Sequence, residues 1–447
     1  MKSRNGKDLG ILTRRELLKA GGATVAGLAG ILASGRPPAI AQQRELTLLS
    51  WSHFVPVSDK ELRRQVEEFG KLANVKVRLD TIAHLQLATK RAAEAQSRSG
   101  HDLILMYAAD PDLYFEQLVD VTDVANEVGP KLGDWINEAD WTFRGKFRAI
   151  PWYHSSHPLN YRSDLLERIG DPPPDTWQDL LRVGKKLKAI GHPVGIQLSH
   201  CNDSNHTMRV IMFSHGASYV AKDGKTITLN SPQTAQAIEY VKRLYTEAME
   251  PEVLSWDDAS NNRSLVGGKA GIILNPTSAY ETARASKAKI AGTQREIHEV
   301  IEFTLPPRGP AGRFGGGSFF LLSIWSFSKN VDLAKDFLRW HFSPEQQDKY
   351  IAASLGFNHP LFKGFLNHPI WAANPKFKFA AEIPTITRHM GYPGPATGLA
   401  QLVFDLHIIP DMFAQAATGR LSTQDAIAWA EKEINEVYAG RRQLRKS

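Results

Sequence analysis

The feature that most constrains this chain is a regular alternation of short strand-like runs with amphipathic helical segments. The run ELTLLSW at 45–51 precedes helical spacing over 59–72, and the pattern returns as an alternating run at 75–80 and a helical segment at 84–99. The continuous apolar run HDLILMY at 101–107 is typical of a strand covered on both faces. This order predicts an α/β fold in which each sheet is mainly parallel and flanked by helices.

A second feature is the segment 145–170, GKFRAIPWYHSSHPLNYRSDLLERIG. One extended piece ends at Ile150, another begins at Leu159, and a helix is predicted to begin near Ser163. An extended segment with prolines, aromatic rings and small hydroxyls is typical of a crossing between two lobes that both bends and contacts ligand. An ordinary buried strand with a turn explains the same residues equally well.

The alternation of strand and helix continues beyond this segment, which predicts a second α/β lobe between about 151 and 310. The glycines at 315–317 and Ser318 precede an apolar strand at 319–324 and mark a second candidate crossing. A chain of 447 residues, 42% of them hydrophobic, is long enough for more than one domain.

The first 41 residues resemble an export signal. The stretch TRRELLK at 13–19 resembles the twin-arginine motif, and a mild apolar run then leads to an A-x-A site that ends at Ala41. The apolar run is shorter than the roughly 20 residues that span a bilayer. We therefore predict a twin-arginine signal peptide over residues 1–41, cleavage after Ala41, and a periplasmic mature chain that is not inserted in the membrane.

The formal charge of +7 is concentrated at the two ends of the chain. Residues 1–41 carry seven Lys and Arg against two Asp and Glu, and the last seven residues carry four basic groups, which leaves the remainder near −2. No nucleic-acid partner is therefore predicted. Because Cys201 is the only cysteine, no intramolecular disulfide can form.

Several stretches resemble the extracellular solute-binding proteins of family 1, the receptors of ABC importers that include the maltose-binding protein and related sugar-binding proteins. The run GGKAGI at 267–272 is similar to the G-x-A-A-M signature of that family. NYRSDLL at 160–166 with PPDTW at 173–177, and the SKN, AKDFL and SPE runs within 328–345, are similar to other family segments. The resemblance extends over nearly the whole mature chain.

This resemblance implies the type II periplasmic binding protein fold, in which two lobes joined by hinge crossings hold a ligand in the cleft between them. The N-terminal lobe would comprise residues 42–150 and 311–363, and the C-terminal lobe residues 151–310 and 364–447. The implied function is that of a receptor and not an enzyme. It would capture a mono- or oligosaccharide and deliver it to the transmembrane subunits of an ABC permease, acting as a monomer without cofactor or metal after export by the twin-arginine machinery.

Sugars present apolar C–H faces and rings of hydroxyls, so their sites combine flat aromatic rings with paired donors and acceptors. Loops at the predicted strand ends and crossings contain this mixture. The predicted ligand-binding residues are Trp51, Ser52, His53, Tyr107, Asp110, Trp152, Tyr153, Asn275, Thr277, Gly317 and Ser318. The family often has a stacking tryptophan shortly after the signature strand. Here that place reads NPTS at 275–278, which argues against a maltodextrin-like ligand.

Other ligands and functions stay open. Asp110 with Asp112 would suit a polyamine, whereas glycerol phosphate would need a cationic side chain in the cleft, and a polyol is a further alternative. A secreted polysaccharide-active enzyme would need two carboxylates facing each other, and the sequence singles out no such pair. The loop containing His200, Cys201 and His206 matches no zinc spacing, and the glycine runs lack phosphate-loop spacing.

Overall fold

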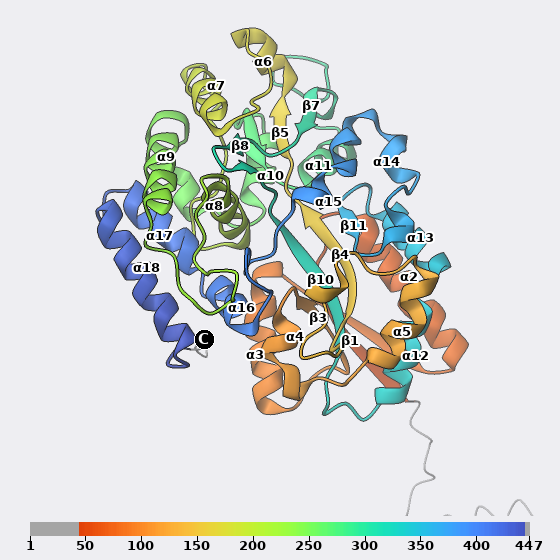
Figure 1. The fold of residues 1–447 in the computed structure, drawn as a ribbon. Coiled ribbons are helices and arrows are strands. Elements are labelled where there is room, and N and C mark those ends of the chain that lie inside the picture. The colour runs from red at the N-terminus through yellow and green to blue at the C-terminus, as the bar shows by residue number, and fades with distance from the viewer. Residues whose placement is uncertain (1–43, 443–447) are drawn as a thin grey trace, which may run out of the picture. The chain divides into compact units, whose positions relative to one another are not determined.

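The computed structural model describes residues 44–442 and contains two main β-sheets (Figure 1). The larger sheet has six strands in the order β11-β4-β10-β3-β1-β2, and the smaller has three in the order β6-β5-β7. The strands of the larger sheet are β1 (Glu45–Trp51), β2 (Lys76–Ile82), β3 (Leu103–Tyr107), β4 (Ile150–Ser156), β10 (Gly317–Ile324) and β11 (Asn358–Pro360). The smaller sheet consists of β5 (Leu159–Arg162), β6 (Ile272–Leu274) and β7 (Ile301–Thr304), and β8 (Arg308–Gly309) pairs with β9 (Gly312–Arg313).

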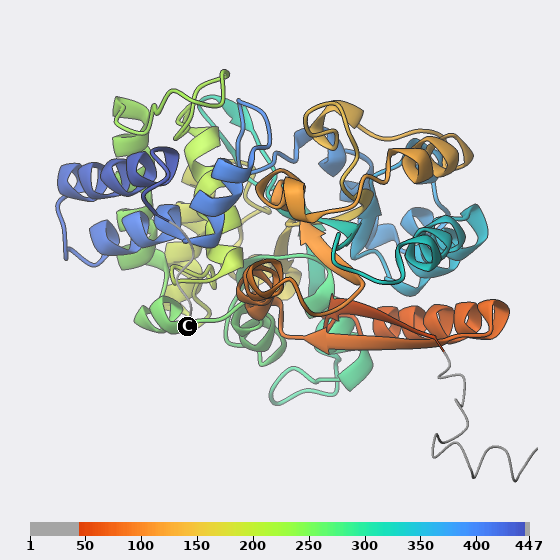
Figure 2. The same cartoon turned by 90° about the horizontal axis from the view of Figure 1, so that it is seen from below.

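The first part of the chain builds the larger sheet as the alternating pattern predicts. β1 and β3 are parallel, with Leu48 opposite Leu103. All five residues of β3 are buried, so the prediction of a strand covered on both faces is confirmed. Helices α2 (Pro56–Ala73) and α3 (Leu87–Ser97) lie between these strands in the sequence, and Figure 2 shows α2 along the β1–β2 edge.

The larger sheet is mixed and the smaller sheet is antiparallel, so the prediction of mainly parallel sheets is wrong. β10 pairs antiparallel with β3 and with β4, and β5 pairs antiparallel with β6 and with β7. The reason is topological. A parallel neighbour needs a crossover connection, whereas β10 enters the larger sheet directly from the segment that follows the smaller sheet and therefore runs back along β3.

The chain changes sheets between β4 and β5, which only His157 and Pro158 separate. The extended piece predicted to begin at Leu159 is thus confirmed as β5, whereas the piece predicted to end at Ile150 lies further along the chain, because β4 begins at Ile150 and runs to Ser156. Further along, β10 returns to the larger sheet and runs beside β4 through the centre of Figure 1. Gly317 is required at this contact, because a Cβ there would lie 2.1 Å from the Ser155 carbonyl oxygen.

A group of five helices is centred on α9, which contacts α7, α8, α17 and α18. The predicted Thr176 cap of α7 is confirmed as a capping box with Asp179, and Ser231 caps α9. Helices α17 and α18 contact each other and α9, and they are the two blue helices side by side in Figure 2. Their bounds are α7 (Trp177–Ala189), α8 (Asn202–Ser214), α9 (Pro232–Ala248), α17 (Ile408–Ala417) and α18 (Thr423–Tyr438).

Shorter helices complete the fold. They are α4 (Asp110–Leu113), α5 (Thr122–Lys131), α6 (Ser163–Ile169), α10 (Ser260–Val266), α11 (Ser278–Ser286), α12 (Val331–His341), α13 (Pro344–Ala353), α14 (Ile370–Ala373), α15 (Ile383–Ile386) and α16 (Gly398–Asp405). Single 3₁₀ turns include η1 (His84–Gln86) and η4 (Pro251–Ser255). Among the helices of residues 44–442, none combines the length and the apolar character needed to cross a membrane. The predicted signal peptide at 1–41 lies outside the described residues.

Candidate functional site

Four strand ends meet at one edge of the larger sheet. β1 and β3 are parallel, and β10 lies antiparallel between β3 and β4, so Trp51, Tyr107, Ser156 and Gly317 all lie toward this edge. Ligand sites in open α/β sheets form outside the carboxyl ends of the parallel strands. A binding site is therefore expected at this edge of the larger sheet.

An aromatic cluster lies behind the edge, with Phe320 at its centre. The Phe320 ring is stacked on Trp51 at 5.3 Å and 8°, and it contacts the rings of Tyr107 and Tyr153 at 5.1 and 4.7 Å. The indole N–H of Trp51 donates to the Tyr153 hydroxyl over 3.0 Å. The structure thus brings together three predicted site residues, of which Trp51 and Tyr153 are enclosed in the cluster.

A cavity of about 220 Å³ begins at Tyr107, and we call it the inner pocket. The segment from η1 to β3 contributes His84, Leu85, Ala88, Thr89, Arg91 and Tyr107. The opposite wall is formed by His200, Asn202, Phe404, Asp405 and His407, from the start of α8 and the junction of α16 with α17. Pockets for drug-sized ligands are about 300–1,000 Å³, so this volume suits a compact ligand such as a single sugar unit.

Six polar atoms of the inner-pocket residues are buried and have no hydrogen-bond partner among the residues that the structure describes. They are the Tyr107 hydroxyl, His84 Nε2, Asp405 Oδ2, His407 Nε2, and Nε and Nη1 of Arg91, whose guanidinium forms an ion pair with Asp110. The His407 ring already donates through Nδ1 to the Asp405 carbonyl over 3.0 Å, which leaves Nε2 as an acceptor. Buried polar groups are nearly always paired, so a set of unpaired ones around one cavity indicates a place for a polar ligand.

The charged groups beside the inner pocket form a compact set. Arg91 Nε lies 2.9 Å from Asp110 Oδ2, and both side chains are almost fully buried. Asp110 also accepts the Tyr107 amide over 2.6 Å, so it supports the pocket from behind and fixes Tyr107. Burial raises the pKa of Asp110 to about 7 against the effect of Arg91. Burial, followed by the charge of Asp110, likewise raises the pKa of Asp405 to about 7.

His84 also belongs to a polar cluster with Asp203 and Asp258. His84 Nδ1 lies 3.1 Å from Asp258 Oδ2, and the Asp203 amide donates to Asp258 Oδ1 over 3.0 Å. Burial and the neighbouring Asp258 charge raise the pKa of Asp203 well above its usual range. Burial acts in the same direction on Asp258, but the hydrogen bond and charge of His84 outweigh it and lower its pKa. These surroundings favour the protonated form of Asp203 and the ionised form of Asp258.

Two neutral histidines extend this polar cluster toward β10. His206 Nε2 lies 2.9 Å from the hydroxyl of the predicted residue Ser318, and its ring meets that of His157 at 5.1 Å. Burial lowers the pKa of His157 to about 3 and that of His206 well below its usual value. Ser318 therefore joins the larger sheet to α8, and Gly317 borders a narrow gap beside the same helix.

The other predicted residues near the first strand and crossing have structural partners. Ser52 is exposed, and its amide donates to the Ile82 carbonyl over 2.8 Å. His53 accepts the Val55 amide at Nδ1 and donates from Nε2 to Asn358 Oδ1, and burial lowers its pKa to about 3. None of these side chains lines the inner pocket.

Trp152, Asn275 and Thr277 are also enclosed. Trp152 is 1% exposed, is stacked on Tyr350 at 4.5 Å, and donates to Gln347 Oε1 over 3.1 Å. The Asn275 side chain donates to Asn262 Oδ1 over 2.7 Å. Thr277, two residues further along the chain, is also buried. The inner pocket is not lined by any of the three.

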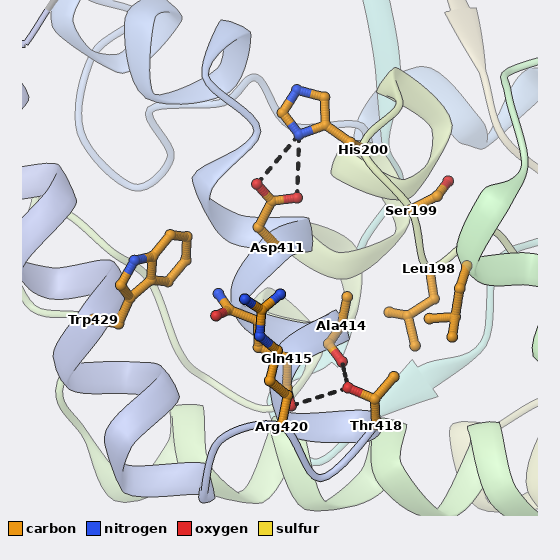
Figure 3. Close-up of a pocket in the computed structure, with 10 residues that line it drawn as sticks. Leu198, Ser199, His200, Asp411, Ala414, Gln415, Thr418, Arg420 and Trp429 are labelled. Atoms are coloured by element: carbon orange, nitrogen blue, oxygen red, sulfur yellow. Dashed lines mark hydrogen bonds and ion pairs between the residues drawn. The ribbon is translucent and has the colours of Figure 1, made fainter.

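A larger depression of about 500 Å³, the outer groove, lies against α17 and α18 (Figure 3). Leu198, Ser199 and Leu254 form one side, and Asp411, Gln415, Arg420 and Trp429 contribute polar groups and an indole ring. His200 borders both the outer groove and the inner pocket. Its Nδ1 lies 3.2 Å from both carboxylate oxygens of Asp411, and this hydrogen bond raises its pKa.

A third cavity, of about 460 Å³, lies on the opposite face of the larger sheet from the aromatic cluster. It is lined by Phe319 and His154, whereas their neighbours Phe320 and Tyr153 belong to that cluster. Successive side chains of a strand point to opposite faces, which separates this cavity from the inner pocket.

Sequence reasoning found Tyr107 but missed most of the inner pocket. His84 has a detectable signal, because it follows the second strand of the alternating pattern and so falls at the same sheet edge. Phe404, Asp405 and His407 have none, because they come from a helical segment almost 300 residues beyond Tyr107.

Two sheets with crossing strands, and a pocket between segments of both halves of the chain, define the type II periplasmic binding protein fold. The predicted type II fold is confirmed by solved structures. Maltose-bound MalE3 of T. maritima has a TM-score of 0.74 at 21% identity, covering 88% of this chain and 99% of that one. A sugar transporter protein of Arthrobacter chlorophenolicus with bound laminaribiose has a TM-score of 0.75 at 18% identity, covering 88% and 98%.

The chain belongs to the bacterial extracellular solute-binding protein family, whose model matches residues 64–379. A probable ABC transporter-binding protein of Deinococcus radiodurans is 24% identical over 417 residues, covering 90% of this chain and 95% of the relative. A lactose-binding protein of Rhizobium radiobacter is 26% identical over 202 residues, covering 44% and 46%. This is a family of solute-binding receptors and not of enzymes, which confirms the resemblance found in the sequence.

Proposed function

We propose that this protein is the receptor of an ABC importer and captures a carbohydrate in the inner pocket. The observation that carries this proposal is the set of buried, unpaired polar atoms on Tyr107, His84, Asp405 and His407 around a cavity of about 220 Å³. The rings of Tyr107 and Phe404, 6.3 Å apart and inclined by 32°, add the aromatic surface that packs on the C–H face of a sugar. Sugar hydroxyls both donate and accept, so they complement acceptor and donor atoms alike.

The two lobes are assigned from the sheets. We place the first lobe around the six-stranded sheet and the second around the three-stranded sheet, with crossings at His157–Pro158 and between β7 and β10. In this division His84 belongs to the first lobe and Asp258 to the second, so their contact spans the cleft, as does that of Ser318 with His206. A ligand that pairs the free atoms favours the closed form by its differential affinity for that form.

The charges narrow the choice among ligands. Arg91, the one arginine lining the inner pocket, is ion-paired with Asp110, so its charge is already offset, which disfavours a phosphate group there. Asp405 Oδ2, which lacks a partner within residues 44–442, favours a hydroxyl or amine donor. An amine-bearing ligand such as a polyamine is therefore the second candidate, and glycerol phosphate is less well supported than either.

We propose that the protein has no hydrolytic activity. Glycoside hydrolases hold two carboxyl groups on either side of the scissile bond. Asp203 and Asp258 are instead linked through the Asp203 amide, and neither lines the inner pocket. Incubation with oligosaccharides and mass analysis of the products tests this point, and release of shorter sugars would contradict it.

We further propose export by the twin-arginine machinery, action as a periplasmic monomer, and delivery of the ligand to the transmembrane subunits of a permease. The motif with Arg14 and Arg15 supports the export step. Cell fractionation tests it: wild-type chain is expected in the periplasm, and the double variant Arg14→Lys/Arg15→Lys in the cytoplasm. Equal periplasmic amounts of both would contradict the assignment.

The binding proposal is tested by thermal unfolding of the mature chain with a panel of mono- and oligosaccharides, sugar alcohols, sugar phosphates and polyamines. Ligand that binds only the folded chain raises its stability by mass action. We expect at least one carbohydrate to raise the unfolding temperature and to make the chain more compact in small-angle scattering. A shift produced only by polyamines or phosphates would contradict the carbohydrate assignment.

A further inference from the structure

We propose that the ligand is an oligosaccharide whose innermost unit occupies the inner pocket and whose next units lie in the outer groove against Trp429. This inference rests on the carbohydrate-receptor function proposed above and specifies its substrate class. It assigns a role to a surface on α17 and α18 that lies outside the edge of the larger sheet.

The outer groove is built by three segments that follow or precede inner-pocket residues. Leu198 and Ser199 lead into His200, helix α17 begins directly after His407, and Trp429 extends from α18 beside it. Figure 3 shows Trp429 on one side of the groove and Leu198 and Ser199 on the other, with Gln415 and Arg420 between them.

His200 connects the two spaces. Its imidazole borders both cavities, is stacked on His407 at 4.2 Å, and is held by the carboxylate of Asp411. Because the His200 side chain is 64% exposed, it separates the two cavities only partly. A chain of sugar units that leaves the inner pocket beside His407 therefore meets the outer groove next.

The chemistry of the outer groove is that of a sugar-binding surface. Trp429 is half-buried and presents an indole, the aromatic ring that packs on the apolar face of a sugar. The side chains of Gln415 and Arg420 make no hydrogen bond or ion pair that the structure describes within residues 44–442, so their amide and guanidinium groups can bind hydroxyls. The carboxylate of Asp411 is engaged by His200, and the Thr418 hydroxyl donates to the Ala414 carbonyl over 2.8 Å.

The relative sizes agree with this division. The inner pocket of about 220 Å³ suits one compact unit, and the outer groove of about 500 Å³, which shares His200 with it, offers more than twice that space. A monosaccharide would use the inner pocket alone and would leave the indole, amide and guanidinium without a role in binding.

The test begins with immobilised mature protein and a pool of neutral oligosaccharides from one to six units long, prepared from maltodextrin, laminarin, arabinan, galactan and cellulose. Mass spectrometry identifies the retained sugars, and calorimetry then measures each length of the retained ladder against wild type, Trp429→Ala and Arg420→Gln. We expect affinity to rise by about tenfold or more with length. Trp429→Ala should remove most of that gain while the shortest binder keeps its wild-type affinity.

Arg168→Gln is the matched control for Arg420→Gln, because Arg168 is exposed on α6 at the end of the smaller sheet, away from α17 and α18 (Figure 1). Thermal unfolding of each variant checks the fold, and Arg420→Gln, an exposed change, keeps the test informative if Trp429→Ala loses stability. Equal affinity for all lengths, or no effect of either groove variant on the longer sugars, would overturn the inference and leave the receptor function intact. Retention of no sugar at all would overturn both.

Discussion

Replacement of Tyr107 by phenylalanine should make the free protein more stable and weaken its ligand binding. The Tyr107 hydroxyl is buried beside the inner pocket and has no hydrogen-bond partner in the described part of the chain. An unpaired buried hydroxyl costs about 1–3 kcal/mol, so its removal should raise the free energy of unfolding by up to that amount. Loss of one hydrogen bond to ligand, about 0.5–1.5 kcal/mol, corresponds to roughly 2- to 13-fold weaker binding.

Tyr153→Phe is the matched control, because it removes a hydroxyl of the same aromatic cluster that does have a partner. The Tyr153 hydroxyl accepts the indole N–H of Trp51 over 3.0 Å, and its loss would leave that buried donor unpaired. We expect a decrease of about 1–3 kcal/mol in the free energy of unfolding. Since Tyr153 does not line the inner pocket, the affinity for ligand should change little.

Both effects are measurable on the same preparations. Urea unfolding gives the two free energies, and calorimetry with the sugar that produces the largest thermal shift gives the affinities. The reasoning is refuted if Tyr107→Phe is destabilised as much as Tyr153→Phe, because its hydroxyl would then have a partner in the free protein. It is equally refuted if both variants bind ligand as tightly as wild type.

Three further predictions follow from burial, ionisation and close packing. Trp152→Ala should unfold about 3–5 kcal/mol more easily in urea, because the ring is 1% exposed and stacked on Tyr350; a stable variant with weakened binding would instead support the role predicted from sequence. Burial raises the pKa of Asp405 in the folded chain, so its stabilising contribution is present below pH 4 and is lost as pH rises to about 7. The free energy of unfolding of Asp405→Asn, measured in urea, should therefore rise relative to that of wild type by about 1.4 kcal/mol per pH unit across that range. An identical pH dependence of the two proteins would contradict this. Gly317→Ala should lower the unfolding temperature, because its Cβ would approach the Ser155 carbonyl oxygen to 2.1 Å; an unchanged temperature would show that β4 and β10 can separate freely.

Much of the local structure was predictable because its causes lie within a few residues. The cap at Thr176, the buried strand at 103–107 and the strands on either side of His157 all follow from spacing and punctuation. The strand directions were not predictable in the same way. Whether β10 runs parallel or antiparallel to β3 depends on the side from which the chain returns to the sheet, and the residues of β10 do not determine that side.

The candidate site shows the same limit. Tyr107 was identified because it ends a strand, and loops at strand ends contact ligands in this class of fold. Trp152 looked equivalent in sequence, yet strand β4 turns its ring toward Tyr350 and Gln347 and away from the inner pocket. An aromatic residue beside a crossing can face either the core or a ligand, and packing against distant helices decides between the two.

By itself the sequence determined the α/β pattern, the place where the chain changes sheets, and the family of receptors, because each is encoded in short-range spacing or in contiguous motifs. The tertiary structure alone decided which polar groups surround the pocket. His84, Tyr107, Asp405 and His407 come from segments far apart in the chain, and their unpaired atoms converge only when both sheets have packed their helices. Side-chain convergence is a property of that packing, which no local pattern of residues specifies.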